Sequence, residues 1–473
     1  MLLASIILSA TVALAEPVAL TLDDAIKIAL SENVSVKVAD KEIKRSEYAK
    51  AGAYASLFPQ IDGSASFQRT LKKQVMYMDG GGFNIASMLG ETLVQYLGPL
   101  YAQHPDISIP IPGGEEETPS GAADGISVGR WNTWSAGLTA SLPLVNFQLW
   151  HSLKLSGEDV ELSIEKARSS RLAMVTQVKS AYYSVLLAQE AFDVYKSVYE
   201  NALTNHALVE EKYKAQKVSE LELSRSAANL ASIVPNLYDS QYAIDLALWQ
   251  LKAVMGVDLD LEFEVVGSLI DYAGSMGTLY TDEELSLERN STIKQLAIQA
   301  EQLADAVKIQ QLSCLPSISL AFSYNYNAMA NDFVFNEYKW NPYSFVGLSL
   351  NIPIFAGGRR ASNIKVARIQ SAELDMQRAE TERQLRIAIR QSLSTMETAM
   401  KSYDAAKSAL TLAQKAYDIT DESYLVGRST LTDLNDAQLT LTQTKLSLCQ
   451  SIFSYLSAKA SLEQTLGYDY TVE

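Results

Sequence analysis

The stretch ALSENVSVK at residues 29–37 recurs, with changes, as SLERNSTIK at residues 286–294. Asn33 in the first stretch corresponds to Asn290 in the second, 257 positions further on. Other matched pairs follow along the chain: Pro59 and Pro316, Gly137 and Gly347, Pro143 and Pro353, Tyr213 and Tyr424, Leu223 and Leu434, Gly256 and Gly467. A duplication of this length predicts two copies of one unit within a single architecture.

The repeat divides the chain into two copies joined by a connecting segment. We place the first copy at residues 16–256, the connection at 257–281 and the second copy at 282–473. The offset between matched residues falls by 47 because the first copy carries extra residues between its two prolines. The extra residues are rich in Gly and Pro, so we expect a long loop at residues 71–131.

Each copy contains two segments in which apolar and polar residues alternate, the pattern of a β-strand with one apolar face. The four predicted strands lie at about residues 61–70, 134–144, 317–328 and 343–354. Ten residues in a strand span about 30 Å at ~3.3 Å per residue, which suits a tilted strand of an outer-membrane barrel. Aromatic residues gather near the strand ends, as in the interfacial girdles of such barrels: Trp131, Trp134, Phe147, Trp150, Phe333, Phe335, Tyr338, Trp340, Tyr343 and Phe355.

Four strands are too few to close a membrane barrel, which begins at about eight strands. An open sheet edge in lipid leaves backbone groups without hydrogen-bond partners. If the strands cross a membrane, other copies of the chain must therefore complete the barrel, and two, three or four chains would satisfy this requirement. A soluble β-sandwich with buried aromatic residues is the alternative.

The remainder of the chain has the composition of long helices. We predict helices at residues 21–57, 147–215, 219–255, 359–424 and 431–466. Apolar residues at spacings of three and four, such as Val178, Tyr182 and Val185, are typical of coiled-coil packing.

Composition and motifs exclude several functions. A formal net charge of −16 argues against nucleic acid as a partner. The three histidines do not have metal-ligand spacing, and the phosphate-binding and nucleophile motifs of common enzymes are missing, so we predict neither an enzyme nor a cofactor or metal site. Cys314 and Cys449 are expected to be unpaired, with a disulfide as the alternative.

The N-terminal residues 1–15 read as a secretory signal peptide that ends in Ala13-Leu14-Ala15. A short buried helix is the alternative. Beyond this segment, the sequence contains no run of 18 apolar residues, so we expect no transmembrane helix.

Two stretches of the second copy carry a family resemblance. They read NIPIFAGGRRASNIKVARIQSAELD from Asn351 and ESYLVGRSTLTDLNDAQLTLTQTK from Glu422. Together with the duplication, they resemble the TolC-type outer membrane efflux proteins over about residues 20–467. The resemblance implies a mainly α-helical homotrimer with a twelve-stranded transmembrane β-barrel, four strands from each chain, and a long helical tunnel through the periplasm. It also implies two partners, a periplasmic adaptor protein and an inner-membrane efflux or ABC transporter, and contact with outer-membrane lipid.

The resemblance further implies a gate at the periplasmic end of the tunnel. Asp433 and Asp436 match a carboxylate ring of the family, and Tyr424 matches the tyrosine of its Tyr/Arg lock. The lock arginine is replaced by Ser429, and Arg428 lies one place earlier. In three copies the carboxylates would form a narrow ring of like charge, suited to cation selectivity or to pH-dependent opening. The alternative is that both aspartates are helix N-terminal acids favoured by the helix dipole.

The turns of the two helical hairpins would face the adaptor in such an assembly. This position makes Lys217, Val218, Ser219, Gly427, Arg428 and Ser429 candidate adaptor contacts. The function predicted is a passive outer-membrane exit duct for efflux or type I secretion. A soluble periplasmic coiled-coil adaptor or scaffold, and a structural protein of the envelope, are the competing hypotheses.

Overall fold

The computed structural model describes residues 18–76, 126–277, 280 and 284–470. The described residues form two compact units, one helical and one made of strands. The strand unit lies within Ser56–Asn146 and Pro316–Ile352, and the helical unit takes the remainder. Each unit therefore draws on both copies of the repeat.

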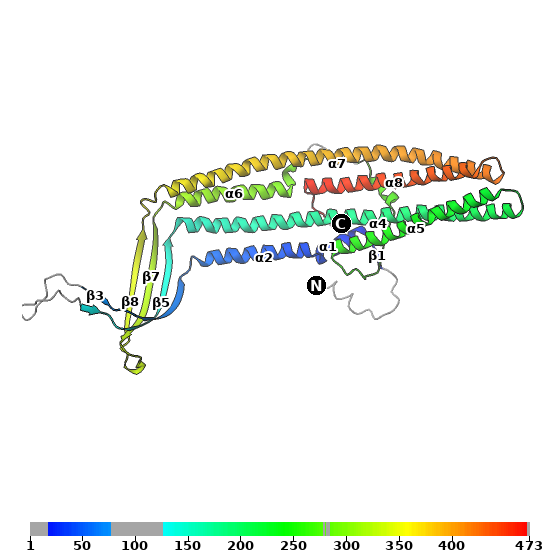
Figure 1. Ribbon diagram of the computed structural model, residues 1–473. Helices are drawn as coiled ribbons and strands as arrows, with labels where there is room; N and C mark the ends of the chain where they lie inside the picture. Colours follow the sequence, from blue (N-terminus) through cyan, green and yellow to red (C-terminus); the bar gives the residue numbers. More distant parts are fainter. Residues whose placement is uncertain (1–17, 77–125, 278–279, 281–283, 471–473) are drawn as a thin grey trace, which may run out of the picture. The chain divides into compact units, whose positions relative to one another are not determined.

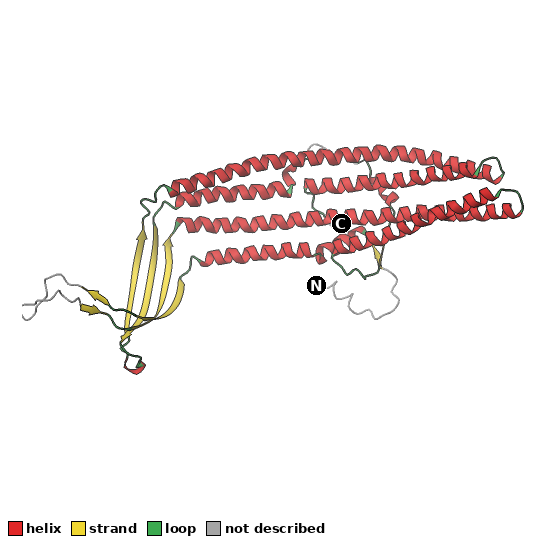
Figure 2. Ribbon diagram, in the orientation of Figure 1, coloured by secondary structure: helices red, strands yellow, loops and turns green. Residues whose placement is uncertain are grey.

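The strand unit is a four-stranded antiparallel sheet with the order β2-β5-β7-β8 (Figure 2). Its strands are β2 (Gln60–Arg69), β5 (Asn132–Val145), β7 (Ser317–Ala330) and β8 (Asn341–Asn351). A short antiparallel ribbon of β3 (Gln74–Met76) and β4 (Ile126–Val128) lies at the two ends of the predicted loop, whose middle is outside the described residues.

The pairing register places residues of one kind in rows across this sheet. One row consists of Ile61, Ala140, Phe322 and Val346, and it is apolar. The row displaced from it by five residues consists of Ser66, Ser135, Asn327 and Asn341, and Ser66 Oγ lies 2.7 Å from Ser135 Oγ. The sheet therefore has one apolar face and one face of small polar side chains, as the alternation predicted.

The helical unit contains seven α-helices among the described residues (Figure 1). They are α1 (Leu22–Glu32), α2 (Val34–Ala55), α4 (Phe147–Lys214), α5 (Glu220–Met255), α6 (Ser291–Leu312), α7 (Arg359–Leu425) and α8 (Leu431–Leu466). Helices α2 and α6 begin and end at an offset of 257, and α5 and α8 do so at 211. The long helices predicted from the sequence are confirmed within one or two residues.

The prediction of one helix over residues 21–57 is wrong. The helix is interrupted at Asn33, whose backbone is extended with φ −63° and ψ 134°. The Asn33 side chain donates from Nδ2 to Val254 O at 2.7 Å, and its Oδ1 accepts from Ser35 N at 2.7 Å. The interruption depends on a contact with α5, which no local pattern in residues 21–57 reveals.

The main core lies where both copies of the repeat meet. Helix α4 packs against α2, α5, α6 and α8. A short parallel pair, β1 (Val18–Leu20) and β6 (Phe263–Val265), is attached to α4 by Tyr182, whose hydroxyl donates to Val266 O at 2.6 Å. The connecting segment also contains the 3₁₀ helix η2 (Leu269–Ser275), and Leu269 is part of this core. The largest side chains fully buried in the core are Tyr182, Tyr455, Ile26, Leu186, Leu251, Met255, Leu269, Ile452, Leu462 and Leu466.

Three sequence predictions concern features outside the core. Cys314 is exposed and Cys449 is buried, and both are free thiols, as expected. Among the helices of the described residues, none combines the length and the apolar character needed to cross a membrane. The predicted signal peptide, residues 1–15, lies outside the described residues.

Candidate functional site

The candidate residues lie at two helical turns, one between α4 and α5 and the other between α7 and α8. Figure 1 shows both turns at the same end of the helical unit. A small apolar core, which we call the tip junction, joins them. Its buried members are Val209, Tyr424, Leu431 and Leu434, and its half-buried members are Leu208, Val218, Leu223 and Tyr417.

Tyr424 is the centre of the tip junction. Its side chain is buried, and Lys212 Nζ of α4 lies 4.7 Å from the centre of its ring. The Tyr424 hydroxyl is buried without a hydrogen-bond partner in the described part of the chain. Burial, together with the negative charge of Glu222 on α5, raises the pKa of this hydroxyl. The residue predicted as part of a lock thus connects the two hairpins of a single chain.

A second contact joins the hairpins beside the tip junction. Asn229 Nδ2 of α5 donates to Asn435 Oδ1 of α8 at 3.1 Å. Within the first hairpin, His206 Nδ1 lies 2.9 Å from Ser226 Oγ. These polar contacts orient α5 and α8 beside the tip junction.

The α7–α8 turn is closed by backbone hydrogen bonds around a left-handed glycine. Gly427 has φ 78°, a left-handed conformation that residues with a side chain rarely adopt. Gly427 N donates to Tyr424 O at 3.1 Å, and Arg428 N donates to Ser423 O at 2.8 Å. Ser429 Oγ donates to Thr420 O at 3.0 Å, so this side chain belongs to the turn, while the Arg428 side chain is exposed.

Asp433 takes part in the start of α8. Thr430 N donates to Asp433 Oδ2 at 2.9 Å, and Thr430 Oγ1 accepts from Asp433 N at 3.2 Å, which forms a capping box. The hydrogen bonds from Thr430 lower the pKa of the Asp433 carboxyl. Asp436 lies almost one turn later, and both side chains are exposed. In the single chain, helix capping therefore describes the contacts of Asp433.

The α4–α5 turn reaches the same geometry without a glycine. Gln216, which corresponds to Gly427, has φ 57°. Ser219 caps α5, and its Oγ accepts from Glu222 N at 3.3 Å. Lys217 is exposed, whereas Val218 is half-buried in the tip junction. Of the predicted adaptor residues, Val218 therefore points partly toward the protein.

Two apolar residues at the α7–α8 turn are not among the candidates taken from the sequence. Leu425 and Val426 are exposed at the end of α7, next to Gly427. Apolar side chains directly before a turn glycine are the signal that could have identified them. They directly precede Gly427, Arg428 and Ser429 in the sequence, and they add accessible apolar surface to the turn.

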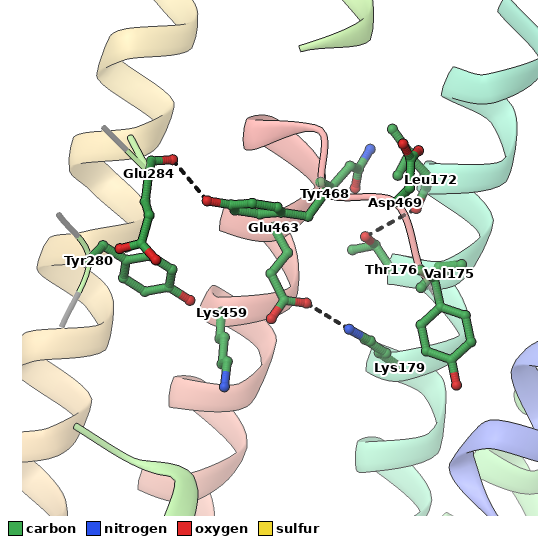
Figure 3. A pocket seen from close by; sticks show the side chains of 12 residues that line it. Leu172, Val175, Thr176, Lys179, Tyr280, Glu284, Lys459, Glu463, Tyr468 and Asp469 are labelled. Atoms are coloured by element: carbon green, nitrogen blue, oxygen red, sulfur yellow. Dashed lines mark hydrogen bonds and ion pairs between the residues drawn. The ribbon is translucent and has the colours of Figure 1, made fainter. Parts of the chain in front are cut away.

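A separate pocket of about 420 Å³ lies beside the C-terminal end of α8 (Figure 3). Its charged groups are partly neutralised, because Lys179 Nζ bonds Glu463 Oε2 at 2.6 Å. Tyr468 donates from its hydroxyl to Glu284 O at 3.1 Å across the same pocket. Within the part of the chain that the structure describes, no three His, Cys, Asp or Glu side chains are grouped as metal ligands.

Comparisons with known proteins agree with this architecture. The profile of the family described as outer membrane efflux protein matches residues 25–257 and 284–468. Outer membrane protein TolC of Escherichia coli is 20% identical over 347 residues, which cover 71% of this chain and 70% of TolC. The pyoverdine export outer membrane protein OpmQ of Pseudomonas aeruginosa is 25% identical over 350 residues, 71% of this chain and 70% of OpmQ.

Among solved structures, the outer membrane channel CmeC of Campylobacter jejuni superimposes with a TM-score of 0.69 at 20% identity. The superposition covers 94% of this chain and 85% of CmeC, so the two proteins share a fold. The family is one of channel proteins and not of enzymes. The chain therefore belongs to the outer membrane efflux protein family, and it is an outer-membrane exit duct of a tripartite export system.

Proposed function

We propose that three copies of this chain assemble into one duct, with a twelve-stranded barrel in the outer membrane and a helical tunnel in the periplasm. Each copy contributes its four strands to the barrel and its long helices to the tunnel wall. The duct conducts cargo passively, and it receives that cargo through a periplasmic adaptor from an inner-membrane efflux or ABC transporter.

The observation that carries this proposal is the open sheet of the strand unit. Strands β2 and β8 are at its two edges, and each is paired on one side among the described strands. The apolar face is exposed, with Ile61, Val346 and Leu348 as large examples. Lipid would cover such a face, but it would leave the edge N–H and C=O groups without partners. Pairing β8 of one copy with β2 of the next satisfies both edges.

The constriction of this duct is assigned to the α7–α8 turn and the start of α8. Asp433 and Asp436 are exposed on α8, and repetition by three copies would concentrate their negative charge around one axis. Tyr424 packs against the start of α8 in the tip junction, and Arg428 is exposed at the turn. A cation passing the ring would be favoured over an anion.

The adaptor is assigned to the outer surface of the two turns. Lys217 and Arg428 offer exposed positive charges, and Ser219, Gly427 and Ser429 provide closely approachable backbone. Charge reversal of Lys217→Glu and Arg428→Glu should weaken adaptor binding at low salt, since these charges lie at the surface. Lys27→Glu on α1 is the matched control for an exposed charge away from the turns. Unchanged adaptor binding in the double variant would contradict this assignment.

The test of the duct is planar-bilayer conductance of the detergent-purified trimer. We expect a small, cation-selective conductance in the unmodified protein. The Asp433→Ala/Asp436→Ala variant should lose the selectivity, because the ring would carry no charge. If the unmodified protein and the variant have the same selectivity, the constriction lies elsewhere in the duct. A trimer that inserts into the bilayer but does not conduct would contradict the duct.

A further inference from the structure

Equivalent helices of the two repeats have unequal surroundings. Helix α4 of the first copy is covered on one side by α2 and α5 and on the other by α6 and α8 of the second copy. Helix α7 is the equivalent of α4, but its main packing neighbours in the described part of the chain are α6 and α8. The side of α7 that corresponds to the α6- and α8-facing side of α4 therefore lies at an edge of the single chain.

The seam between α4 and α6 contains two buried carboxylates that share an exposed lysine. Lys154 Nζ of α4 lies 2.7 Å from Asp305 Oδ2 and 3.1 Å from Glu158 Oε1. Asp305 is 1% exposed and Glu158 is 5% exposed. Further along the seam, Ser291 Oγ of α6 donates to Glu165 O of α4 at 3.0 Å.

The repeat-related residues at the edges of the chain are large, apolar and uncovered. Ile369 on α7 corresponds to Glu158, and Tyr48 on α2 corresponds to Asp305; they are 58% and 78% exposed. Val34 on α2 corresponds to Ser291, and Met376 on α7 corresponds to Glu165; both are exposed apolar residues.

The seam between α4 and α8 gives a third pair. Thr176 of α4 lies 3.4 Å from Ala460 O of α8, in the region drawn in Figure 3. Their equivalents are Ile387 on α7 and Trp249 on α5, and both side chains are exposed. Two direct contacts inside the chain, and two carboxylates joined by Lys154, thus correspond to three pairs of exposed apolar residues, one member of each pair on either edge.

We propose that α7 of one copy packs against α2 and α5 of the next copy, with Met376 on Val34, Ile387 on Trp249, and Ile369 and Tyr48 within the same seam. This inference rests on the proposed trimer and adds the residues that hold it together. In this arrangement, the movement that superimposes the first repeat on the second also superimposes the second repeat on the first repeat of the neighbouring chain. The seam inside the chain is therefore the template for the seam between chains, with apolar side chains in place of buried charges.

The two edges suit a second copy of this chain better than an unrelated protein. They are two unlike surfaces, one on α7 and the other on α2 and α5, which is the condition for head-to-tail association that closes into a ring. Burial of six large apolar side chains is a favourable contribution to such an interface.

The ion pair between α4 and α8 has no counterpart ion pair at the edges. The Lys179–Glu463 ion pair corresponds to Arg390 and Lys252, which are both basic. Lys252 is turned toward its own chain, where Nζ donates to Leu259 O at 2.7 Å. The charge of Lys252 is thus directed away from a repulsive contact with Arg390 of a neighbouring copy.

Disulfide cross-linking tests the pairing. In a Cys314→Ser/Cys449→Ala background, Val34→Cys/Met376→Cys should give dimers and trimers on a non-reducing gel after mild oxidation, because the equivalent residues Ser291 and Glu165 are in direct contact. Val34→Cys/Ile369→Cys is the matched control. Positions 369 and 376 are seven residues apart, about 10 Å along a helix, which is beyond disulfide reach. We expect at least about fivefold more cross-linked product from the first pair.

A second control reports on the template seam. Glu165→Cys/Ser291→Cys should lose its free thiols on oxidation without a change in oligomeric size, because the two residues are in contact within the chain. Light scattering of the unmodified protein in detergent separates the two proposals. A trimer in which the 34/376 pair cross-links no better than the 34/369 pair would overturn the seam alone. A chain that stays monomeric would overturn the proposed trimer and the seam with it.

Discussion

The two repeats agree closely at one kind of contact and differ at another. We call the contact of the α5 end with Asn33, and that of the α8 end with Asn290, the joints, and the α4–α5 and α7–α8 turns the tips. At the first joint, α5 ends at Gly256 and Asn33 Nδ2 donates to Val254 O at 2.7 Å. At the second, α8 ends at Gly467 and Asn290 Nδ2 donates to Thr465 O at 2.6 Å. Both glycines are left-handed, with φ of 75° and 77°.

The tips have diverged in sequence while keeping their backbone. Gln216 occupies the left-handed position that Gly427 holds in the other turn, and Glu222 and Arg225 stand where Asp433 and Asp436 stand. At a joint, two backbones approach so closely that few residues fit. At a tip, the diverged side chains of Gln216, Arg225, Asp433 and Asp436 are exposed and can change. The comparison indicates that the joints maintain the fold and the tips carry what is specific to each repeat.

The largest effect should come from adding a methyl group at a joint. A Cβ at Gly467 would lie 2.3 Å from Arg289 O, and at Gly256 it would lie 2.9 Å from Asn33 Cα. Left-handed strain and overpacking together should cost Gly467→Ala roughly 3 kcal/mol, and Gly256→Ala somewhat less. Denaturant midpoints followed by circular dichroism measure both. Gly52→Ala, where the added atom meets nothing within 4 Å, is the control. Equal midpoints for all three variants would contradict the tight joint.

A smaller effect is expected from the asparagines of the joints. Asn290→Ala removes the bond to Thr465 O and the cap on Ile293 N, and Asn33→Ala removes the equivalent pair. Each substitution should cost about 2 kcal/mol, since a cap and a buried partner are both lost. The same unfolding assay applies, and costs that differ widely between Asn33 and Asn290 would break the equivalence of the joints.

The tips should respond in opposite directions to exchange of their turn residues. Gly427→Ala should destabilise by about 1 kcal/mol, because the left-handed conformation is strained for a residue with a side chain. Gln216→Gly should stabilise by somewhat less than 1 kcal/mol, since the relief of strain is offset by the added freedom of the unfolded chain. Local unfolding at the tips, followed by amide hydrogen exchange, measures both. A Gln216→Gly variant that is less protected would show that Gln216 is not strained.

The smallest effect concerns pH. The capping box holds the pKa of Asp433 below its usual value, so its contribution to stability is present above about pH 4 and is lost as the pH falls through the lowered pKa. In Asp433→Asn, hydrogen exchange at the start of α8 should lose this pH dependence. Glu222→Gln is the matched control at the start of α5. An unchanged pH profile in Asp433→Asn would assign the dependence to another group.

Much of the fold could be predicted from the sequence because its signals are local. Alternation marked the four strands, and Gly256 and Gly467 marked the ends of two long helices. The break at Asn33 was missed because the atom that holds it, Val254 O, is more than 200 residues away. The tip junction was missed for the same reason, since Val209 and Tyr424 come from different repeats.

The site was predicted mainly through the family resemblance. The resemblance indicated Tyr424, Asp433 and the two turns, and the comparisons with known proteins confirm the family. They favour the exit duct over the soluble adaptor or scaffold. The gate and adaptor roles of these residues remain predictions, because both depend on surfaces that other chains must complete.

The buried hydroxyl of Tyr424 has a consequence for the movement of the tips. A buried hydroxyl without a partner costs about 1–3 kcal/mol compared with one in water. That cost disappears when the two hairpins separate and water reaches the hydroxyl. The apolar contacts of the tip junction thus hold the turns together, and the buried hydroxyl lowers the free energy needed to separate them.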